Sequence, residues 1–358
     1  MSTPKSHVQA NPASDGDRLS IGLIADSPTF PGHWEQIVEK VRFADRLGFS
    51  SVWLGEAWGY ELFTSLADLA RATTHIKIGA GVANVFSRSP AVIASAAATL
   101  DERSNGRLIL GLGTSGPQVV EHWHGVPFKK PLRRLREYVE IINLILRREK
   151  LVYQGEVFQM DRGFTLRFRP VRSHIPIYLA ALGPRSIALT GALADGILPI
   201  HWPASDFSVL RQQLSDAASA ANRPVDAVRI APYLTVEAIV DESQRDLARR
   251  KARAPVAFYV GRMGTFYASM LSRHGFTRDV AAIQQAWKVG QSAAIDAVSE
   301  ELLDAIACVG TPAEIVQTLR AWHKRGMDEP LITMPAGSAD EAAPLLESLA
   351  HSAGILPF

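Results

Sequence analysis

The sequence predicts an α/β protein built as a single (β/α)8 TIM barrel with insertions. Short, continuously apolar runs, typical of strands buried on both faces, alternate with amphipathic helical patterns along most of the chain. No linker or internal repeat divides this series. The 358 residues, with 47% hydrophobic content, fall within the range of about 200 to over 400 residues found for such barrels. A doubly wound open sheet shows the same alternation and is the alternative fold.

The first half of the chain contains strand and helix patterns in strict alternation. Residues 33–48 carry apolar side chains at helical spacing, and Gly48 stands where such a helix ends. Ser89 is placed to cap a helix that starts at Pro90, because proline at the first helical position loses no hydrogen bond. Strands are predicted at 19–25, 51–54, from 76 onward and at 107–113, and helices at 33–48, 62–73, 90–104 and 132–149.

The second half resumes the alternation after an interruption. Residues 150–175 show the pattern strand, turn, strand, which predicts an inserted hairpin. Thr311, Pro312 and Glu314 form a capping-box pattern at the start of a later helix. The stretch 241–307 has a helical pattern and is longer than one helical connection between two strands requires, so we expect extra helices there. Strands are predicted at 175–180, 195–200, 228–240 and 329–335, and helices at 184–194, 206–221, 311–326 and 340–351.

Composition and charge exclude several classes of protein. A formal net charge of +2 with 21% charged residues does not indicate a nucleic-acid surface. Cys308 is the one cysteine, so no internal disulfide forms, and its apolar neighbours predict a buried thiol. No apolar run approaches the roughly 18 residues of a membrane span, and residues 1–18 lack the apolar core of a signal peptide. We therefore expect a flexible tail at 1–18, a barrel domain at 19–358, and a cytoplasmic protein that binds neither membrane nor nucleic acid.

The third predicted strand contains glycines that weaken a buried strand. The stretch from Ile76 to Pro90 passes through Gly79 and Gly81 before a polar turn. Glycine inside a strand marks a bulge or a close approach by a ligand or another backbone. The residues leave two interpretations open, a simple bulge and a backbone that supports a flat ring.

The fourth predicted strand ends in a loop with the spacing GxGxxG, formed by Gly111, Gly113 and Gly116. A dinucleotide-binding fingerprint is disfavoured, because Pro117 and the loop 122–125 replace the tightly packed helix that it requires. At the carboxyl end of a barrel strand, such a loop still presents backbone N–H groups to an anion or a ring. The positions concerned are Gly113, Thr114, Ser115 and Gly116.

Residues 182–186 form a second candidate anion site. Gly183 permits a close approach and Pro184 starts a helix, whose first N–H groups suit a phosphate, with Arg185 adding positive charge. An ordinary loop between a strand and a helix is the alternative. His122 and His124 form an HxH pair on a loop pattern without accompanying carboxylates, so no metal site is predicted.

Further candidates stand at the carboxyl ends of the predicted strands, where barrel enzymes carry their chemistry. They are Asp26, Glu56, Asn84, Thr114, Gly183 and His201. Aromatic residues in the adjoining loops and first helical turns either wall an apolar substrate pocket or seal the barrel. They are Trp34, Trp58, Phe86, Trp123 and Trp202.

Three segments, 76–116, 175–198 and 309–330, resemble the bacterial-luciferase-like flavin and deazaflavin enzymes, in collinear order over about 19–350. The resemblance is strongest to the methylenetetrahydromethanopterin reductase branch, which uses coenzyme F420. It implies a (β/α)8 barrel, usually a homodimer, with the deazaflavin ring at the carboxyl face. It also implies a non-prolyl cis peptide at Gly81–Val82 behind that ring. The cofactor contacts that it implies are Asp26, Gly81, Val82, Asn84, Gly113–Gly116, and, around the phosphate of the tail, Ala181, Leu182, Gly183, Pro184, Arg185 and Ser186.

Two positions depart from the related sugar-phosphate dehydrogenases. Those enzymes carry an Asp-His pair at the end of the second strand, where this chain has Glu56-Ala57. They also carry a glutamate in the fourth-strand loop, where this chain has Gly116. Oxidation of a sugar phosphate is therefore not expected.

The resemblance implies an F420-dependent oxidoreductase that transfers a hydride to or from a small organic molecule. Glu56 is our candidate for the proton donor or acceptor and His201 the second, while a structural carboxylate is the alternative role for Glu56. The alternative functions are an FMN-dependent monooxygenase and a non-catalytic flavin-binding protein. We expect a homodimer through small apolar helix faces, although packing on the chain's own barrel explains them too. These faces comprise Leu66, Ala67, Ala70, Ala94, Ala97 and Ala98.

Overall fold

A computed structural model gives the structure of the protein over residues 18–25, 32–355 and 357. The tail expected at 1–18 lies outside these residues, apart from Arg18. Asp26, which the sequence places among the cofactor contacts, also lies outside them.

Parallel strands form a closed ring at the centre of the molecule. They are β1 (Gly22–Ile24), β2 (Ser51–Leu54), β3 (Lys77–Asn84), β4 (Leu108–Gly113), β7 (Ile177–Leu179), β8 (Gly196–Ile197), β9 (Arg229–Ile230), β10 (Tyr233–Ala238) and β12 (Leu331–Thr333). Their order is β10-β12-β1-β2-β3-β4-β7-β8-β9. β9 continues through Ala231 and Pro232 into β10, and Ile200 just beyond β8 bridges to Tyr233. The two ends of the sheet therefore join, which confirms the predicted barrel and excludes an open doubly wound sheet.

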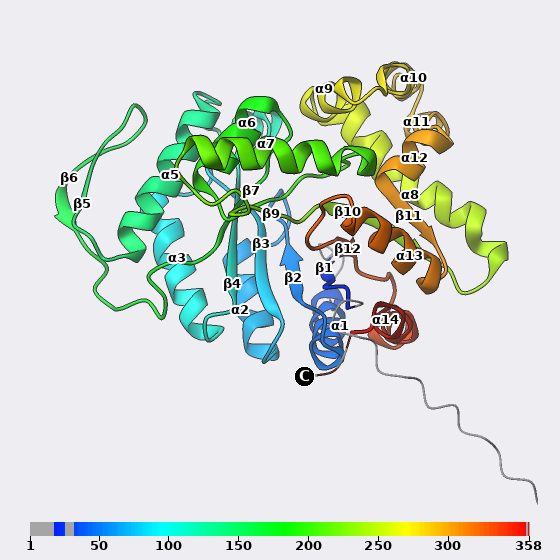
Figure 1. Ribbon diagram of the computed structural model, residues 1–358, viewed down its shortest axis with the longest axis horizontal. Coiled ribbons are helices and arrows are strands. Elements are labelled where there is room, and N and C mark those ends of the chain that lie inside the picture. The colour runs from blue at the N-terminus through cyan, green and yellow to red at the C-terminus, as the bar shows by residue number, and fades with distance from the viewer. Residues whose placement is uncertain (1–17, 26–31, 356, 358) are drawn as a thin grey trace, which may run out of the picture.

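Helices that follow these strands pack around the ring (Figure 1). They are α1 (His33–Leu47), α2 (Leu62–Ala72), α3 (Pro90–Arg103), α5 (Pro131–Leu146), α6 (Pro184–Leu193), α7 (Phe207–Ala220), α13 (Pro312–His323) and α14 (Ala339–Ala353). The predicted helix ends are confirmed. Ser89 caps α3 by accepting from the N–H of Val92, Gly48 ends α1 with φ 94°, and Thr311 and Glu314 form a capping box on α13.

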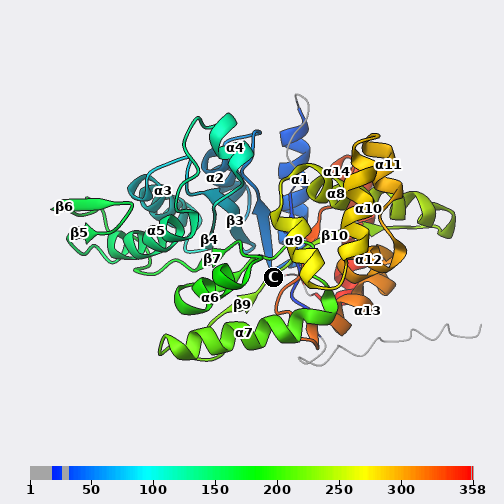
Figure 2. The same ribbon diagram turned by 90° about the horizontal axis from the view of Figure 1, so that it is seen from above.

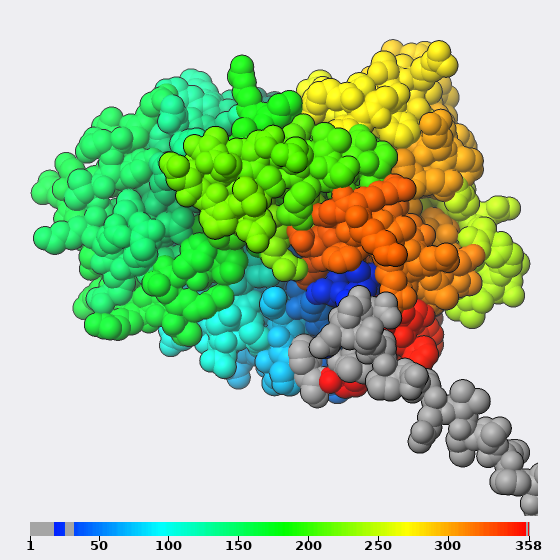
Figure 3. Space-filling model, viewed as in Figure 1, coloured from blue at the N-terminus to red at the C-terminus, as the bar shows by residue number. Residues whose placement is uncertain are grey.

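Two insertions lie on opposite sides of the barrel, as the view from above shows (Figure 2). The predicted hairpin is confirmed as β5 (Leu151–Gln154) and β6 (Gln159–Phe164), which pair antiparallel. The helical stretch consists of the insertion helices α8 (Arg245–Arg262), α9 (Phe266–Arg273), α10 (Thr277–Trp287), α11 (Gln291–Asp296) and α12 (Glu300–Ile306). In the space-filling view these helices project at the upper right, and α7 crosses the face between them and the hairpin side (Figure 3). Short 3-10 turns, Ala204–Asp206 and Glu242–Gln244, precede α7 and α8.

Two short elements differ from the prediction. β11 (Ala307–Gly310) pairs in parallel with β10, at the end of the stretch for which only helix was expected. Cys308 is buried in this strand, and burial raises the pKa of its thiol, as suits an inert side chain. α4 (Pro117–His122) replaces part of the expected loop, so His122 ends a helix. Both elements have at most six residues, too few for a hydrophobic period to show.

Aromatic side chains fill the inside of the ring and occupy space that glycines leave. Trp53 lies between Tyr178 and Tyr233, with ring centroids 5.7 Å and 6.5 Å away. A Cβ atom on Gly79 would stand 2.2 Å from the Trp53 ring, and one on Gly196 would stand 2.6 Å from the Tyr178 ring. The glycines of these buried strands therefore serve packing inside the barrel as well as the bulge described below.

The apolar helix faces first expected between subunits are buried within this chain. Leu66, Ala94, Ala97 and Ala98 have no exposed surface and Ala70 is 2% exposed, so α2 and α3 direct these residues at their own barrel. Packing on the chain's own barrel therefore explains these five residues, while Ala67 is half-buried, and the dimer stays a prediction. In the part of the chain that the structure describes, no helix is both long and apolar enough to cross a membrane.

Candidate active site

The third strand of the barrel is interrupted by a bulge. Ala80 pairs with Leu110, whereas Ala83 pairs with Leu112, so three steps along β3 face two along β4. The Gly81–Val82 peptide bond is cis, as the family resemblance implied. The bulge lies toward the carboxyl end of β3, at the edge of the barrel where chemistry is expected.

The first two glycines of the GxGxxG motif make room for this bulge. A Cβ atom on Gly111 would stand 2.0 Å from the carbonyl oxygen of Ala80. A Cβ atom on Gly113 would stand 2.5 Å from Cγ2 of Val82. The motif is thus explained by close packing of β4 against β3, which supports the interpretation that it is not a dinucleotide fingerprint.

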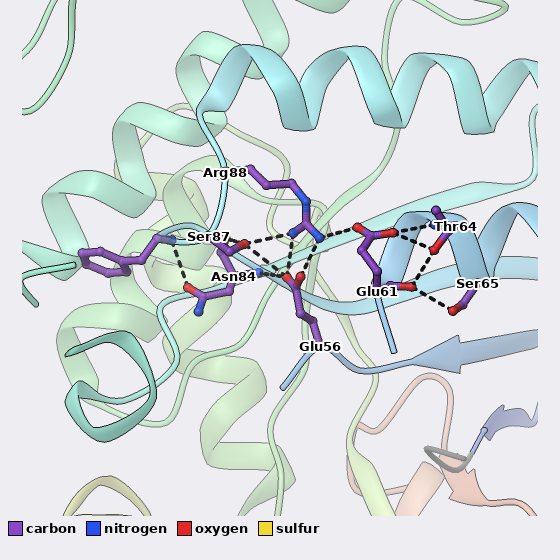
Figure 4. A network of polar contacts seen from close by, with 8 residues as sticks. Glu56, Glu61, Thr64, Ser65, Asn84, Ser87 and Arg88 are labelled. Atoms are coloured by element: carbon purple, nitrogen blue, oxygen red, sulfur yellow. Dashed lines mark hydrogen bonds and ion pairs between the residues drawn. The ribbon is translucent and has the colours of Figure 1, made fainter. Parts of the chain in front are cut away.

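A network of ionic and hydrogen bonds joins β2 to the loop after β3 (Figure 4). Oε2 of Glu56 accepts from the backbone N–H of Asn84 and from Nη1 of Arg88, each at 2.9 Å. Its Oε1 lies 2.6 Å from Nη2 of Arg88. Arg88 also pairs with Glu61, whose side chain caps α2 by accepting from Thr64. The Glu56 side chain is 8% exposed, so this is an almost fully enclosed pair.

Two members of this network, Arg88 and Glu61, have shifted pKa values. Burial by itself lowers the pKa of Arg88, but hydrogen bonds and charge from Glu56 and Glu61 outweigh it and raise that pKa. Burial by itself raises the pKa of Glu61, but bonds from Thr64 and the charge of Arg88 outweigh it and lower that pKa. Arg88 was not singled out in the sequence. The feature that could have indicated it is its position as the one cation in the turn after β3, while two carboxylates, Glu56 and Glu61, follow β2.

Asn84 closes the turn beyond the bulge. It is 3% exposed, its side-chain oxygen accepts from the N–H of Phe86, and its carbonyl accepts from Ser87. Phe86 is buried, stacked on Phe128 with ring centroids 5.2 Å apart. Phe86 is therefore packed within the loop, and its role as pocket wall or barrel seal stays a prediction.

The two candidate anion loops lie on neighbouring strands. β4 pairs with β7, and a Cβ atom on Gly113 would stand 3.4 Å from Cβ of Ala180. Gly116 is the N-cap of α4 and Gly183 the N-cap of α6. Thr114 and Ser115 lie between the strand and α4, with Ser115 at φ 54°.

The start of α6 combines a fixed turn with an exposed arginine. Ser186 accepts from the N–H of Gly183 and donates to its carbonyl, which fixes the turn. Pro184 and Arg185 are exposed, and no hydrogen bond or ion pair involves Arg185 within the described residues. Ala181 is buried, and the carbonyl of Leu182 accepts from Arg273 of α9 at 2.7 Å. The loop is thus tied to an insertion helix while its guanidinium remains accessible.

His201 and Trp202 follow β8 and are both 2% exposed. Burial lowers the pKa of His201 to about 4, so its ring is neutral near pH 7. Nε2 of His201 and Nε1 of Trp202 have no hydrogen-bond partner within the described residues. The His201 ring packs on Tyr259 of α8, with centroids 5.2 Å apart. A neutral imidazole here can hydrogen-bond a ligand, but its low pKa makes it a weak base, and it does not act as an imidazolium acid at neutral pH.

The other aromatic candidates lie on separate segments of the chain. Trp58 is 52% and Trp123 62% exposed. Trp34 on α1 donates to Asp68 on α2 at 2.6 Å. No cluster of three or more potential metal ligands occurs among the described residues.

The bulge of β3, the glycine loop after β4 and the exposed Arg185 after β7 thus lie on or after three neighbouring strands of a parallel α/β barrel. The chain belongs to the luciferase-like monooxygenase family, whose model matches residues 15–329. Over 337 residues it is 32% identical to a putative coenzyme F420-dependent oxidoreductase of Mycobacterium tuberculosis, covering 88% of this chain and 96% of the relative.

Two further relatives belong to one type of reductase. The chain is 32% identical to the 5,10-methylenetetrahydromethanopterin reductase of Archaeoglobus fulgidus, over 83% of this chain and 89% of that one. It superposes on the structure of the coenzyme F420-dependent tetrahydromethanopterin reductase from Methanopyrus kandleri with a TM-score of 0.79 and 26% identity. That match covers 94% of this chain and 97% of the other.

Proposed function

We propose that the protein is a coenzyme F420-dependent oxidoreductase that transfers a hydride between the deazaflavin and an organic substrate. The observation that carries the proposal is the surface made by the Gly81–Val82 bulge and the β4 glycines Gly111 and Gly113, which we call the cradle. It lies beside the free guanidinium of Arg185. The F420-dependent relatives of 32% and 26% identity support the choice of cofactor.

The residues present fit this cofactor. The bulge would lie against the ring, with Gly113 to Gly116 beside it, while Gly183, Arg185 and Ser186 would hold the phosphate of the tail. When bound, the deazaflavin supplies the hydride chemistry. The chain's own contribution is to orient the ring and the substrate and to exclude water. Asp26 remains a proposed contact outside the described residues.

The proton-transfer residue remains a proposal. Glu56 accepts hydrogen bonds on one oxygen and faces Arg88 with the other, which supports the positioning role considered for it. His201 has an unpartnered ring nitrogen that is available to a hydrogen bond, whereas its lowered pKa makes it a weak base for proton transfer. We retain both residues as candidates, and the pH profile of the Glu56→Gln variant described in the Discussion tests the first of them.

Titration of the purified protein with F420 and, separately, with FMN tests the cofactor. We expect quenching of F420 fluorescence to saturate at micromolar or lower concentration and FMN to bind far more weakly. Tight FMN binding with no affinity for F420 would instead favour an FMN-dependent monooxygenase. Binding of either cofactor without turnover of any reductant would favour a non-catalytic flavin-binding protein. Methylenetetrahydromethanopterin is the first substrate to test with reduced F420, because the named reductases are similar to this chain over most of its length.

A homodimer and a cytoplasmic location remain predictions from the family resemblance. The helix faces first expected at the interface are buried in the chain's own barrel, so they do not support the dimer. Light scattering at micromolar protein concentration tests the dimer, and a monomer mass would contradict it.

A further inference from the structure

The carbonyl of Gly81, at the centre of the bulge, is held by a side chain from the far side of the barrel. Oη of Tyr233, the first residue of β10, donates to this oxygen at 2.9 Å. The two residues are 152 positions apart in the sequence. Burial raises the pKa of Tyr233, so its phenol stays protonated and remains a donor.

Two glycines leave open the space around this bond. A Cβ atom on Gly81 would stand 1.5 Å from Oη of Tyr233. A Cβ atom on Gly55, just after β2, would stand 3.1 Å from the Gly81 carbonyl oxygen. Glycine at both positions therefore lets the phenol reach the carbonyl.

The bulge is also fixed from its other side, where Val82 packs on the glycine face of β4. Cγ1 of Val82 is 3.1 Å from the position of a Cβ atom on Gly111, and Cγ2 is 2.5 Å from one on Gly113. Contacts with β4 thus set the position of Val82, while the hydrogen bond from Tyr233 sets the direction of the preceding carbonyl.

We propose that Tyr233 is a positioning residue for the cofactor, acting through its hydrogen bond to the Gly81 carbonyl. The bond fixes the surface against which the deazaflavin ring would lie. The proposal rests on the F420-dependent function proposed above. It assigns Tyr233 no contact with the reacting atoms, because its hydroxyl is engaged by the backbone.

Tyr178 provides a matched control inside the same barrel. Both tyrosines belong to the aromatic cluster around Trp53. Tyr178 lies on β7, and its hydroxyl makes no hydrogen bond within the described residues. Its ring fills the space left by Gly196, the first residue of β8, where a Cβ atom would stand 2.6 Å from it. Removing its hydroxyl therefore changes the cluster without touching the bulge.

The test compares Tyr233→Phe with Tyr178→Phe in the full-length protein. We measure the F420 dissociation constant by fluorescence quenching, the melting temperature of the cofactor-free protein, and peptide-level hydrogen exchange over residues 77–90. We expect Tyr233→Phe to raise the dissociation constant roughly three- to tenfold, as for loss of one buried hydrogen bond, and to speed exchange in that segment. Tyr178→Phe should change the dissociation constant less than about twofold.

Gly55→Ala tests the same carbonyl without altering Tyr233. Its added methyl group presses on the Gly81 oxygen, so we expect weaker F420 binding with little change in melting temperature. Unchanged F420 affinity in both Tyr233→Phe and Gly55→Ala would overturn the proposal, as would equal losses in Tyr233→Phe and Tyr178→Phe. If the unmodified protein fails to bind F420, the proposed function itself fails, and exchange over residues 77–90 still reports whether Tyr233 holds the bulge.

Discussion

Glu56 and Arg88 form the ion pair on which the loop after the bulge is built. The carboxylate accepts from the Asn84 N–H and from Arg88 at 2.9 Å, so it links the backbone and the side chain of that loop. Its position at the end of β2 also makes it the first candidate for proton transfer. Substitutions at the two partners separate these roles.

We predict that Glu56→Gln lowers the free energy of unfolding by about 2 kcal/mol, since hydrogen bonds to a charged group contribute about 1.5–3 kcal/mol. If Glu56 only positions the loop, Glu56→Gln and Arg88→Lys should weaken F420 binding to a similar degree. Both variants should then keep the pH profile of kcat. If Glu56 carries the proton, Glu56→Gln alone should lose the corresponding limb of that profile. Steady-state kinetics between pH 5 and 9, together with F420 titrations, check both outcomes.

Arg185 should contribute to cofactor binding without contributing to stability. Its side chain is exposed at the N-terminus of α6 and has no partner within the described residues. We predict that Arg185→Gln raises the F420 dissociation constant about tenfold, as expected for loss of about 1.4 kcal/mol from one charged contact. The melting temperature should not change, and the salt dependence of binding should become weaker. Arg167→Gln, at another exposed arginine, is the control, and an equal loss there would refute a specific phosphate contact.

The buried His201 should make the protein less stable in acid. Its pKa is about 4 in the folded protein against 6.5 for the free side chain, so the unfolded chain binds more protons between these values. The free energy of unfolding therefore has its full value above pH 6.5 and decreases as pH falls toward 4. The total decrease is about 3 kcal/mol, at 1.36 kcal/mol per pKa unit. Urea unfolding at several pH values should show this slope in the unmodified protein and a smaller slope in His201→Asn.

The His174→Asn variant is the control, because the pKa of His174 is shifted in the opposite direction to that of His201. Its hydrogen bond to Asp195 raises its pKa, so its contribution is present below pH 6.5 and is lost as pH rises through the higher folded pKa. The side chain is 54% exposed, which makes its contribution small. His174→Asn should therefore leave the acid loss in place, and loss of that slope in this variant would contradict the assignment to His201.

The hydrophobic pattern predicted the barrel because the helices are long enough to show their period, while the buried strands stand out as continuous apolar runs between them. Ser89, Pro90 and Thr311 also marked helix starts correctly through local capping chemistry. β11 was missed because its four residues follow a helix without a turn signal. The sequence pattern thus predicts well those elements that are formed by interactions between residues close in the chain.

The support of the candidate site depends instead on residues far apart in the chain. The phenol of Tyr233 meets Gly81, and Arg88 meets Glu56, only because the closed ring brings their strands together. Gly79 and Gly81 signalled an unusual strand, but not which side chains would occupy the space beside them. Identification of such partners requires the register of the sheet, which the sequence pattern does not give.

Val82 and Gly113 allow a direct test of the cradle as a packed unit. A methyl group on Gly113 would stand 2.5 Å from Cγ2 of Val82 but 3.5 Å from its Cβ. Gly113→Ala alone must therefore displace Val82, and we expect a loss of about 1–3 kcal/mol in stability and about tenfold weaker F420 binding. Val82→Ala removes Cγ2, so the double variant Val82→Ala/Gly113→Ala regains ordinary contact distance and should recover most of both losses. A double-mutant cycle on unfolding free energy and F420 affinity measures this coupling, which we expect to exceed about 1 kcal/mol. Additive effects would show that β3 and β4 do not form one cradle, because independent sites have no coupling to recover.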